Sequence, residues 1–435
     1  MTGLSPKFCR WLSCPASWFF VAFIAVSPAG ASEQNVPASP GALARAVEAA
    51  NPGDVLLLAP GRHDGPIQVN KPLTLSGAGN DPGAVHVVGN GSGSVITVTA
   101  PDVIIRGLTI SGSGSSADNL DSGVQLLKKA RGAQVRGNRI LGNLVGVDIH
   151  GAKDAVVEGN VIEGRRDHRM NSRGNGVYVW NAPGAEVTGN DIRWGRDGIF
   201  VNTSRDNAFK ANRFRDLRFG IHYMYAHDST VVDNVSQGNH LGFAVMYSRN
   251  VHLEGNLSEG DRDYGIMLNY ANESVISGNH VLGAGDRCVF IYNAHKNQFG
   301  NNWFEGCNIG VHFTAGSERN HITGNAFVSN RTQVKYVGSQ WIDWSDGGRG
   351  NYWSDHGAFD LDGDGIAESP YRPNDGLDRV LWKQPAARLL LGSPATQLIR
   401  WSLSSFPAFL PGGVIDSHPL MNPDKPSLPD WQLPL

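Results

Sequence analysis

Short stretches of alternating apolar and polar residues recur through the middle of the chain at a nearly constant spacing. Four of them begin with glycine and follow one another at intervals of 22 or 23 positions, namely Gly198-Ile-Phe-Val, Gly220-Ile-His-Tyr, Gly242-Phe-Ala-Val and Gly265-Ile-Met-Leu. The alternation predicts a short strand with one buried face. A fixed period of this length indicates one supersecondary unit that is repeated along the chain.

A second mark lies between these stretches and consists of glycine or aspartate followed by asparagine. Such a pair suits a turn that needs left-handed backbone dihedrals. Together the two marks predict coils of three short strands and three turns, stacked about 4.8 Å apart, so that each strand pairs with its copies above and below. The pairs are Gly137-Asn138, Gly159-Asn160, Gly189-Asn190, Asp233-Asn234, Gly255-Asn256, Gly278-Asn279, Gly300-Asn301 and Gly324-Asn325.

The expected fold is therefore all-β, a right-handed parallel β-helix of the pectin-lyase-like type over residues 32–340. The Leu-x-x-Leu-x-Leu pattern of leucine-rich repeats is absent from the sequence, and no repeat is long enough for the helices of ankyrin or tetratricopeptide units. A short capping helix from Gly41 to Ala50 is expected to cover the open edge of the first coil with three apolar residues. These residues are Leu43, Ala46 and Val47.

Other segments depart from the period. Two insertions, at 111–121 and 165–173, are expected on loops of one face of the solenoid. A C-terminal cap with an Asp-rich loop is expected at 341–376, and an apolar, proline-rich extension at 377–435.

Composition and the first residues indicate an exported globular protein. The 435 residues include 54 glycines, which fits a fold dense in turns, and the net charge of −3 gives no reason to expect nucleic acid as a partner. Residues 1–31 are typical of a signal peptide, with Lys7 and Arg10 before an apolar run and a small-x-small site ending at Ala31. The mature, exported chain would begin near Ser32, and an uncleaved anchor is the alternative.

Two cysteines, Cys288 and Cys307, would remain after export. Aligned on the repeat, they lie in successive coils, three positions out of register. A turn could close that offset, so a disulfide is one interpretation and two free thiols are the other.

One column of side chains has metal-binding chemistry. If the residues flanking His222 face the core, His222 and Met224 face outward, Met246 lies above Met224, and Met267 lies two coils above His222. Asn269 and Tyr292 would continue the column. Thioether and imidazole donors together suit Cu(I), so His222, Met224, Met246 and Met267 are copper candidates. The alternative is a protein-binding surface, because methionine adapts to irregular contacts.

A second candidate metal site is the acidic loop that contains Asp360, Asp362, Asp364 and Glu368. Carboxylates at alternate positions followed by a glycine reproduce the first part of a calcium-binding loop. The twelfth position, however, is Tyr371 in place of the closing glutamate. Structural calcium and a turn held by the aspartates themselves are both consistent with this pattern.

Clustered carboxylates of the kind that cleave polysaccharides are not evident in the sequence. Asp148 and Asp206 are single, and Asp261 and Asp263 belong to a turn where charges are usually solvent-facing. The chain is therefore not expected to be an enzyme. The alternative carried forward is an exported β-helix that binds or cleaves carbohydrate.

Several segments in order resemble the NosD family of periplasmic maturation proteins for nitrous-oxide reductase. The resemblance rests on Arg218-Phe-Gly-Ile-His-Tyr-Met-Tyr-Ala-His227, Asn239-His-Leu-Gly-Phe-Ala-Val-Met-Tyr-Ser248, Gly350-Asn-Tyr-Trp-Ser-Asp355 and Asp416-Ser-His-Pro-Leu-Met421, among others. It implies a non-enzymatic part in assembling the copper centres of the reductase. The partners that it implies are nitrous-oxide reductase, a copper chaperone and an inner-membrane ABC transporter.

The C-terminal extension carries apolar residues outside any repeat. It is divided by Gly392-Ser-Pro394 into pieces too short to span a bilayer. One interpretation is a cap folded over the last coil. The other is an arm that binds the periplasmic side of the transporter, through Trp382, Leu389, Leu390, Leu398 and Trp401.

Overall fold

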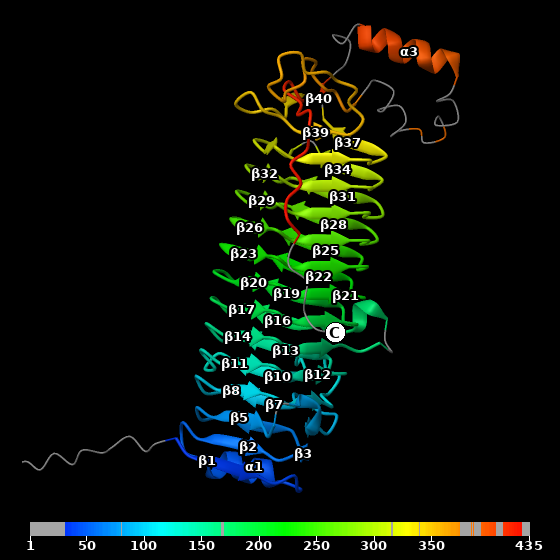
Figure 1. Cartoon of the computed structure of the whole chain (residues 1–435). Coiled ribbons are helices and arrows are strands. Elements are labelled where there is room, and N and C mark those ends of the chain that lie inside the picture. The colour runs from blue at the N-terminus through cyan, green and yellow to red at the C-terminus, as the bar shows by residue number, and fades with distance from the viewer. Residues whose placement is uncertain are drawn as a thin grey trace, which may run out of the picture.

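The computed structural model describes residues 31–79, 81–166, 169–314, 316–338, 340–374, 384, 386, 393–405 and 412–428. They form a parallel β-solenoid whose coils stack along one axis, with helix α1 (Ala42–Ala49) at one end and the C-terminal cap at the other (Figure 1). The expected signal peptide lies outside the described residues.

Three parallel sheets make the walls, and each complete coil contributes one strand to each. Sheet A has 13 strands. They are β1 (Glu33–Val36), β2 (Val55–Leu58), β5 (Thr74–Gly77), β8 (Ile104–Arg106), β11 (Gln134–Arg136), β14 (Val156–Glu158), β17 (Glu186–Thr188), β20 (Ala208–Lys210), β23 (Ser229–Val232), β26 (Val251–Glu254), β29 (Val275–Ser277), β32 (Gln298–Gly300) and β35 (His321–Thr323).

Sheet B also has 13 strands. They are β3 (Gly61–Asp64), β6 (Val85–Val88), β9 (Thr109–Ser111), β12 (Arg139–Leu141), β15 (Val161–Glu163), β18 (Asp191–Arg193), β21 (Arg213–Arg215), β24 (Val235–Gln237), β27 (Leu257–Glu259), β30 (His280–Leu282), β33 (Trp303–Glu305), β36 (Ala326–Val328) and β39 (Tyr352–Trp353).

Sheet C has 12 strands, most of them six residues long, and contains the glycine-led stretches of the repeat. They are β4 (Ile67–Val69), β7 (Ile96–Val98), β10 (Ser122–Leu127), β13 (Val145–His150), β16 (Val177–Trp180), β19 (Asp197–Asn202), β22 (Phe219–Met224), β25 (Leu241–Met246), β28 (Tyr264–Asn269), β31 (Arg287–Tyr292), β34 (Ile309–Thr314) and β37 (Thr332–Val337).

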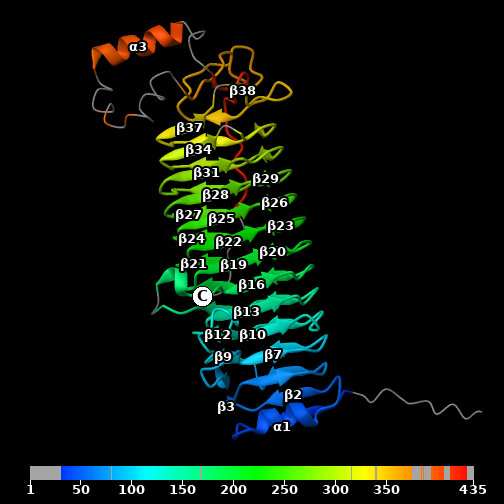
Figure 2. The same ribbon diagram turned by 180° about the vertical axis from the view of Figure 1, so that it is seen from behind.

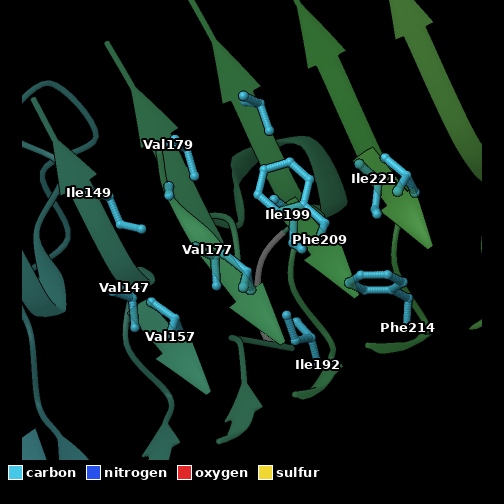
Figure 3. Packing of buried hydrophobic residues seen from close by; sticks show 14 of the residues in the cluster. Val147, Ile149, Val157, Val177, Val179, Ile192, Ile199, Phe209, Phe214 and Ile221 are labelled. Atoms are coloured by element: carbon cyan, nitrogen blue, oxygen red, sulfur yellow. The ribbon is translucent and has the colours of Figure 1, made fainter. Parts of the chain in front are cut away.

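Alternate residues of each strand fill the interior. In Figure 3, Val177, Ile199 and Ile221 of neighbouring sheet C strands project toward the same core as Phe209 of sheet A and Phe214 of sheet B. All five side chains are buried. The residues between them on each sheet C strand therefore face outward, which confirms the alternation expected from the sequence.

The asparagines of the second mark are buried and stack into a ladder inside the solenoid. Each amide donates to the side-chain oxygen of the asparagine one coil above, as Asn234 does to Asn256 at 3.0 Å and Asn256 to Asn279 at 2.9 Å. The left-handed residue comes just before each of them, with φ near 63° at Gly255 and Gly278. The turn was expected, but the internal ladder was not.

The pair at 300–301 was placed one residue too early. Asn301 is the left-handed residue, with φ 54°, and the buried asparagine is Asn302, which donates to Asn325 at 2.7 Å. Ala211 and Asn212 form a further pair that the sequence pattern does not reveal, because alanine seldom adopts the φ of 52° found there.

The C-terminal end is closed by tryptophans and by a residue distant in sequence. Trp344 and Trp353 are buried and stack with each other at 6.1 Å and over Phe327 of the last coil. Asp416 ends the asparagine ladder, because its carboxylate accepts from the Asn351 backbone nitrogen at 2.7 Å and from Trp353 Nε1 at 2.8 Å.

These contacts correct two expected boundaries. Strand β39 continues sheet B into the segment that was assigned wholly to the cap. The extension at 377–435 is not a single arm, since strand β40 (Gly413–Ile415) pairs with β38 (Trp341–Asp343) and residues up to 428 run back along the coils (Figure 2). In that return segment the Pro426 carbonyl lies 2.9 Å from His280 Nε2.

Both insertions lie on the turn from sheet B to sheet C, as expected for loops of one face. The first connects β9 to β10, and the second connects β15 to β16 and contains the short 3-10 helix η2 (Met170–Ser172). Another 3-10 helix, η1 (Pro82–Ala84), precedes β6. The insertions touch each other, because Arg165 Nη2 donates to the Gly114 carbonyl at 2.7 Å.

Candidate metal centre

The copper candidates are brought together in the register that the repeat predicts. On the outer face of sheet C, Met224 pairs with Met246 in the next coil, and His222 and Met267 are both register partners of the intervening Ala244. Because coils are spaced by about 4.8 Å, the backbones at His222 and Met267 lie about 10 Å apart. We call this group of His222, Met224, Met246 and Met267 the methionine face.

Two columns of outward side chains cross this face. The first contains Tyr178, Phe200, His222, Ala244, Met267, Phe290 and His312, and the second contains Trp180, Asn202, Met224, Met246, Asn269 and Tyr292. Asn269 and Tyr292 therefore continue the second column, as expected. Ala244 interrupts the large side chains of the first column between His222 and Met267.

His222 is held rigidly although it faces outward. Its ring stacks on Phe200 with centroids 4.7 Å apart and meets Phe219 edge-on at 4.9 Å, so that only 7% of the residue is exposed. Its Nδ1 lies 3.2 Å from Asp197 Oδ2. Its Nε2 is buried and has no hydrogen-bond partner among the described residues.

Asp197 fixes which nitrogen of His222 is available. This carboxylate is buried and accepts two hydrogen bonds from Arg218, at 2.8 and 2.6 Å. Burial alone would raise the pKa of Asp197, but hydrogen bonds from His222 and Arg218 and the charge of Arg218 outweigh it and hold the pKa below its ordinary value. An ionised carboxylate can only accept, so Nδ1 of His222 donates to Asp197 and Nε2 is the nitrogen left for another partner.

An unpaired imidazole nitrogen beside thioethers is the chemistry of a soft-metal ligand set. A metal-binding histidine commonly donates its other nitrogen to a carboxylate, which orients the ring and raises its basicity. The three methionine side chains are partly exposed, so an ion can reach them from solvent. The sequence analysis did not single out Asp197 and Arg218, because the repeat pattern does not show that Asp197 contacts Arg218 and His222 of the next coil.

The other histidines near this region have different surroundings. His227, His240 and His295 lie on turns, and His252 lies on the exposed side of sheet A. His312 belongs to the first column and is 9% exposed. Burial, together with the charges of Arg287 and Lys335, lowers the pKa of His312 to about 3, so it is neutral at physiological pH.

An exposed ladder of tyrosines borders the methionine face and was not expected. Tyr225, Tyr247 and Tyr270 each follow the last residue of a sheet C strand, and their rings stack at 5.0 and 5.1 Å. All three adopt left-handed backbone dihedrals, with φ between 49° and 52°, a conformation that asparagine and glycine favour. Asn181 occupies the equivalent position in an earlier coil.

The acidic loop brings three of its four candidate ligands together. Carboxylate oxygens of Asp360, Asp362 and Glu368 lie within 4.8 Å of one another, and Asp364 is not in that group. Backbone N–H groups of the loop already donate to these side chains, as Gly365 does to Asp360 at 2.9 Å. This geometry suits both a calcium ion and a self-bonded turn, so calcium binding stays a prediction.

Cys288 and Cys307 form a disulfide, with Cα atoms 5.6 Å apart. Cys288 lies at the start of β31, and Cys307 lies on the turn that precedes β34, one coil above. The bond joins successive coils at the offset that the repeat alignment indicated. Both cysteines are buried, so this bond is structural and does not reach the methionine face.

The predicted transporter arm is only partly described. Trp382, Leu389 and Leu390 lie outside the described residues. Leu398 and Trp401 belong to helix α3 (Pro394–Ser405) and are each 64% exposed. Figure 1 shows helix α3 near the cap end of the solenoid. No helix among the described residues is long and apolar enough to cross a membrane.

Asp261 was expected to face solvent and does not. It is fully buried, and its carboxylate accepts from the Asn239 backbone nitrogen at 2.8 Å and from Ser258 Oγ at 2.6 Å. Burial raises the pKa of Asp261 to about 6 despite these hydrogen bonds. Its bonds are those of a structural ladder residue.

Solved structures with a similar fold include the Dettilon tailspike protein (gp208), with a TM-score of 0.53, 15% identity and coverage of 69% of this chain and 64% of that one. A GH87 alpha-1,3-glucanase catalytic domain in complex with nigerose has a TM-score of 0.55, 10% identity and coverage of 71% and 66%. At these identities the similarity establishes the β-solenoid fold alone.

Sequence relatives are much closer. Residues 158–358 match the family model described as periplasmic copper-binding protein (NosD). The probable ABC transporter binding protein NosD of Stutzerimonas stutzeri is 41% identical over 392 residues, 87% of this chain and 89% of that protein. Its Pseudomonas aeruginosa counterpart is 41% identical over 380 residues, 84% and 87% of the two chains. With this identity over most of its length, the chain belongs to the NosD family.

Proposed function

We propose that this protein is a non-enzymatic periplasmic protein that holds Cu(I) transiently on the methionine face and passes it on for assembly of the copper centres of nitrous-oxide reductase. A copper chaperone would supply the ion, and an inner-membrane ABC transporter would be the membrane partner. The observation that carries the proposal is the unpaired, buried Nε2 of His222 on the sheet face that also carries Met246 one coil above and Met267 two coils above. The family description as periplasmic and copper-binding supports it.

The ligand set favours Cu(I) over other ions. Thioether sulfur and imidazole nitrogen are uncharged ligands, and thioether sulfur is soft. Such a set coordinates a soft, singly charged ion such as Cu(I) well without neutralising its charge. Asp197 and Arg218 neutralise each other and supply no further ligand. Partly exposed methionines on a flat sheet allow the ion to leave, as transfer to a client requires.

Replacing Met224, Met246 and Met267 together by leucine is expected to abolish tight Cu(I) binding while the protein stays folded. Leucine keeps nearly the same volume and removes the sulfur. Competition with a colorimetric Cu(I) chelator measures the affinity, and the copper content of reductase co-expressed with the variant measures maturation. Full maturation of the reductase by the triple variant would contradict the proposal.

The matched control replaces Met170 and Met421 by leucine. Both lie away from sheet C, Met170 in the second insertion and Met421 in the cap. This control should bind Cu(I) as the native chain does. If the triple variant fails in maturation with unchanged Cu(I) affinity, the methionine face is a protein-binding surface, the alternative left open by the sequence.

Helix α3 is the part of the expected arm that can be tested. The relatives are named probable ABC transporter binding proteins, and we propose that Leu398 and Trp401 contact the periplasmic side of such a transporter. Truncation after residue 375 would not test this, because it also removes Asp416 from the cap. Point substitutions on α3 avoid that damage.

Changing Leu398 and Trp401 to glutamate is expected to stop co-purification with the transporter and to leave thermal unfolding unchanged. Charges on an apolar contact surface must be desolvated on binding, which is unfavourable. The control is Leu361→Glu on the acidic loop, a residue that is 79% exposed. A lower unfolding temperature of the α3 variant would instead show that α3 is part of the cap.

A further inference from the structure

A second pair of metal-ligating side chains lies on the outer face of sheet C, three coils before His222. Val147 and Ile149 of β13 point into the core (Figure 3), so Asp148 and His150 point outward. Asp148 is nevertheless fully buried. Its Oδ2 accepts a hydrogen bond from Gln125 Nε2 at 3.1 Å, and its Oδ1 has no hydrogen-bond partner among the described residues.

The unpaired oxygen lies near an imidazole nitrogen, but too far from it for a hydrogen bond. Asp148 Oδ1 lies 3.9 Å from His150 Nδ1. The His150 ring is held against Trp180, with centroids 4.3 Å apart, and its side chain is 37% exposed, so an ion can reach the pair from the imidazole side although Asp148 itself is buried. Oxygen and nitrogen ligands lie about 2.0–2.2 Å from a bound zinc-like ion, so two ligands at a tetrahedral angle lie about 3.4 Å apart, which a small rotation of the exposed His150 ring would reach.

We propose that Asp148 and His150 bind a divalent cation through Asp148 Oδ1 and His150 Nδ1, with water completing its coordination. A buried carboxylate oxygen without a partner is costly unless a proton or a cation satisfies it. The neighbouring imidazole nitrogen provides the second ligand. A proton on the carboxylate would satisfy the oxygen without any nitrogen nearby, whereas a cation needs one more ligand. Burial raises the pKa of Asp148 to about 7, which shows how little the surrounding protein stabilises its charge.

The ligand types separate this site from the methionine face. A carboxylate and an imidazole suit Cu(II) or Zn(II), whereas thioethers suit Cu(I). Tyr178 and Phe200 stack at 5.4 Å and fill the column between Asp148 and His222. The two sites are therefore independent, and failure of one does not affect the other.

Titration of the full chain with Cu(II), followed by electron paramagnetic resonance, tests the proposal. The native chain should show a signal with one nitrogen ligand that Zn(II) displaces. Asp148→Asn keeps the shape of the side chain and the Gln125 contact. It should weaken Cu(II) binding at this site by at least about 10-fold, which is what loss of even a supporting contact behind a metal ligand costs. His150→Gln should have the same effect and, being half-exposed, should not disturb folding.

Matched controls are Asp206→Asn and His252→Gln, which change an exposed aspartate and an exposed histidine elsewhere. Both should retain the signal, as should the triple methionine variant. If Asp148→Asn and His150→Gln bind Cu(II) with unchanged affinity and spectrum, Asp148 is simply protonated and the proposal is wrong. Loss of binding in the Asp206 or His252 control alone would equally overturn it.

Discussion

Replacing Asn256 by leucine is expected to lower the free energy of unfolding by at least about 3 kcal/mol, because four buried hydrogen bonds are lost at once. The Asn256 side-chain oxygen accepts from the backbone nitrogen and from the side-chain nitrogen of Asn234, at 3.0 Å each. Its side-chain nitrogen donates to the Val231 carbonyl at 2.8 Å and to the Asn279 side-chain oxygen at 2.9 Å. Leucine has a similar size but can make none of these four hydrogen bonds in the buried ladder.

Denaturant unfolding followed by circular dichroism measures the effect. The matched control is Gln298→Leu, an exposed residue on sheet A that is also an amide. It should change stability by only a few tenths of a kcal/mol. Equal stability of the two variants would mean that the ladder contributes nothing beyond the turn.

Replacing Asp197 by asparagine is expected to weaken Cu(I) binding by about 10- to 100-fold without removing any ligand, which is the usual cost of losing the carboxylate behind a metal-binding histidine. Asparagine can still accept from His222 but carries no charge to stabilise the protonated Nδ1. It also leaves Arg218 without its ion pair, so some loss of stability is expected.

Two measurements separate a role of Asp197 in orienting His222 from a role in folding alone. Nitrogen-15 NMR of the folded protein should show His222 as the Nδ1–H tautomer in the native chain and a mixture in Asp197→Asn. Arg218→Gln should lower stability with a smaller loss of Cu(I) affinity. If both variants lose stability equally and neither loses Cu(I) affinity, Asp197 acts only in folding.

The pKa of Asp197 also sets an expectation for pH. Because the folded-state pKa lies below the ordinary value near 3.8, the stabilisation is complete above that value and is lost only as the pH falls through the lower, folded pKa. Stability contributed by this group should therefore be constant between about pH 5 and 8. Unfolding measured across that range checks it against Asp197→Asn.

The repeat period predicted what depends on register. Since each coil advances by 22 or 23 residues, the pairing of Met224 with Met246, and the position of Met267 two coils from His222, follow from counting. The alternation within each strand also predicted which of these side chains face outward.

What depends on contacts between different positions of the repeat was not predictable. Asp197 is the first residue of β19 and reaches His222 of the next coil diagonally, 25 residues away. Asp416 closes the ladder from a segment with no repeat at all. The tyrosine ladder requires a backbone conformation that tyrosine rarely adopts, so propensity argues against the arrangement that is found.

X-ray absorption of the full chain loaded with one equivalent of Cu(I) tests the central claim most directly. Copper on the methionine face should show sulfur neighbours together with one imidazole nitrogen. In the triple methionine variant the sulfur scattering should disappear, and in the Met170 and Met421 control it should persist. Copper surrounded only by nitrogen and oxygen in the native chain, or a sulfur signal that survives the triple substitution, would contradict the account.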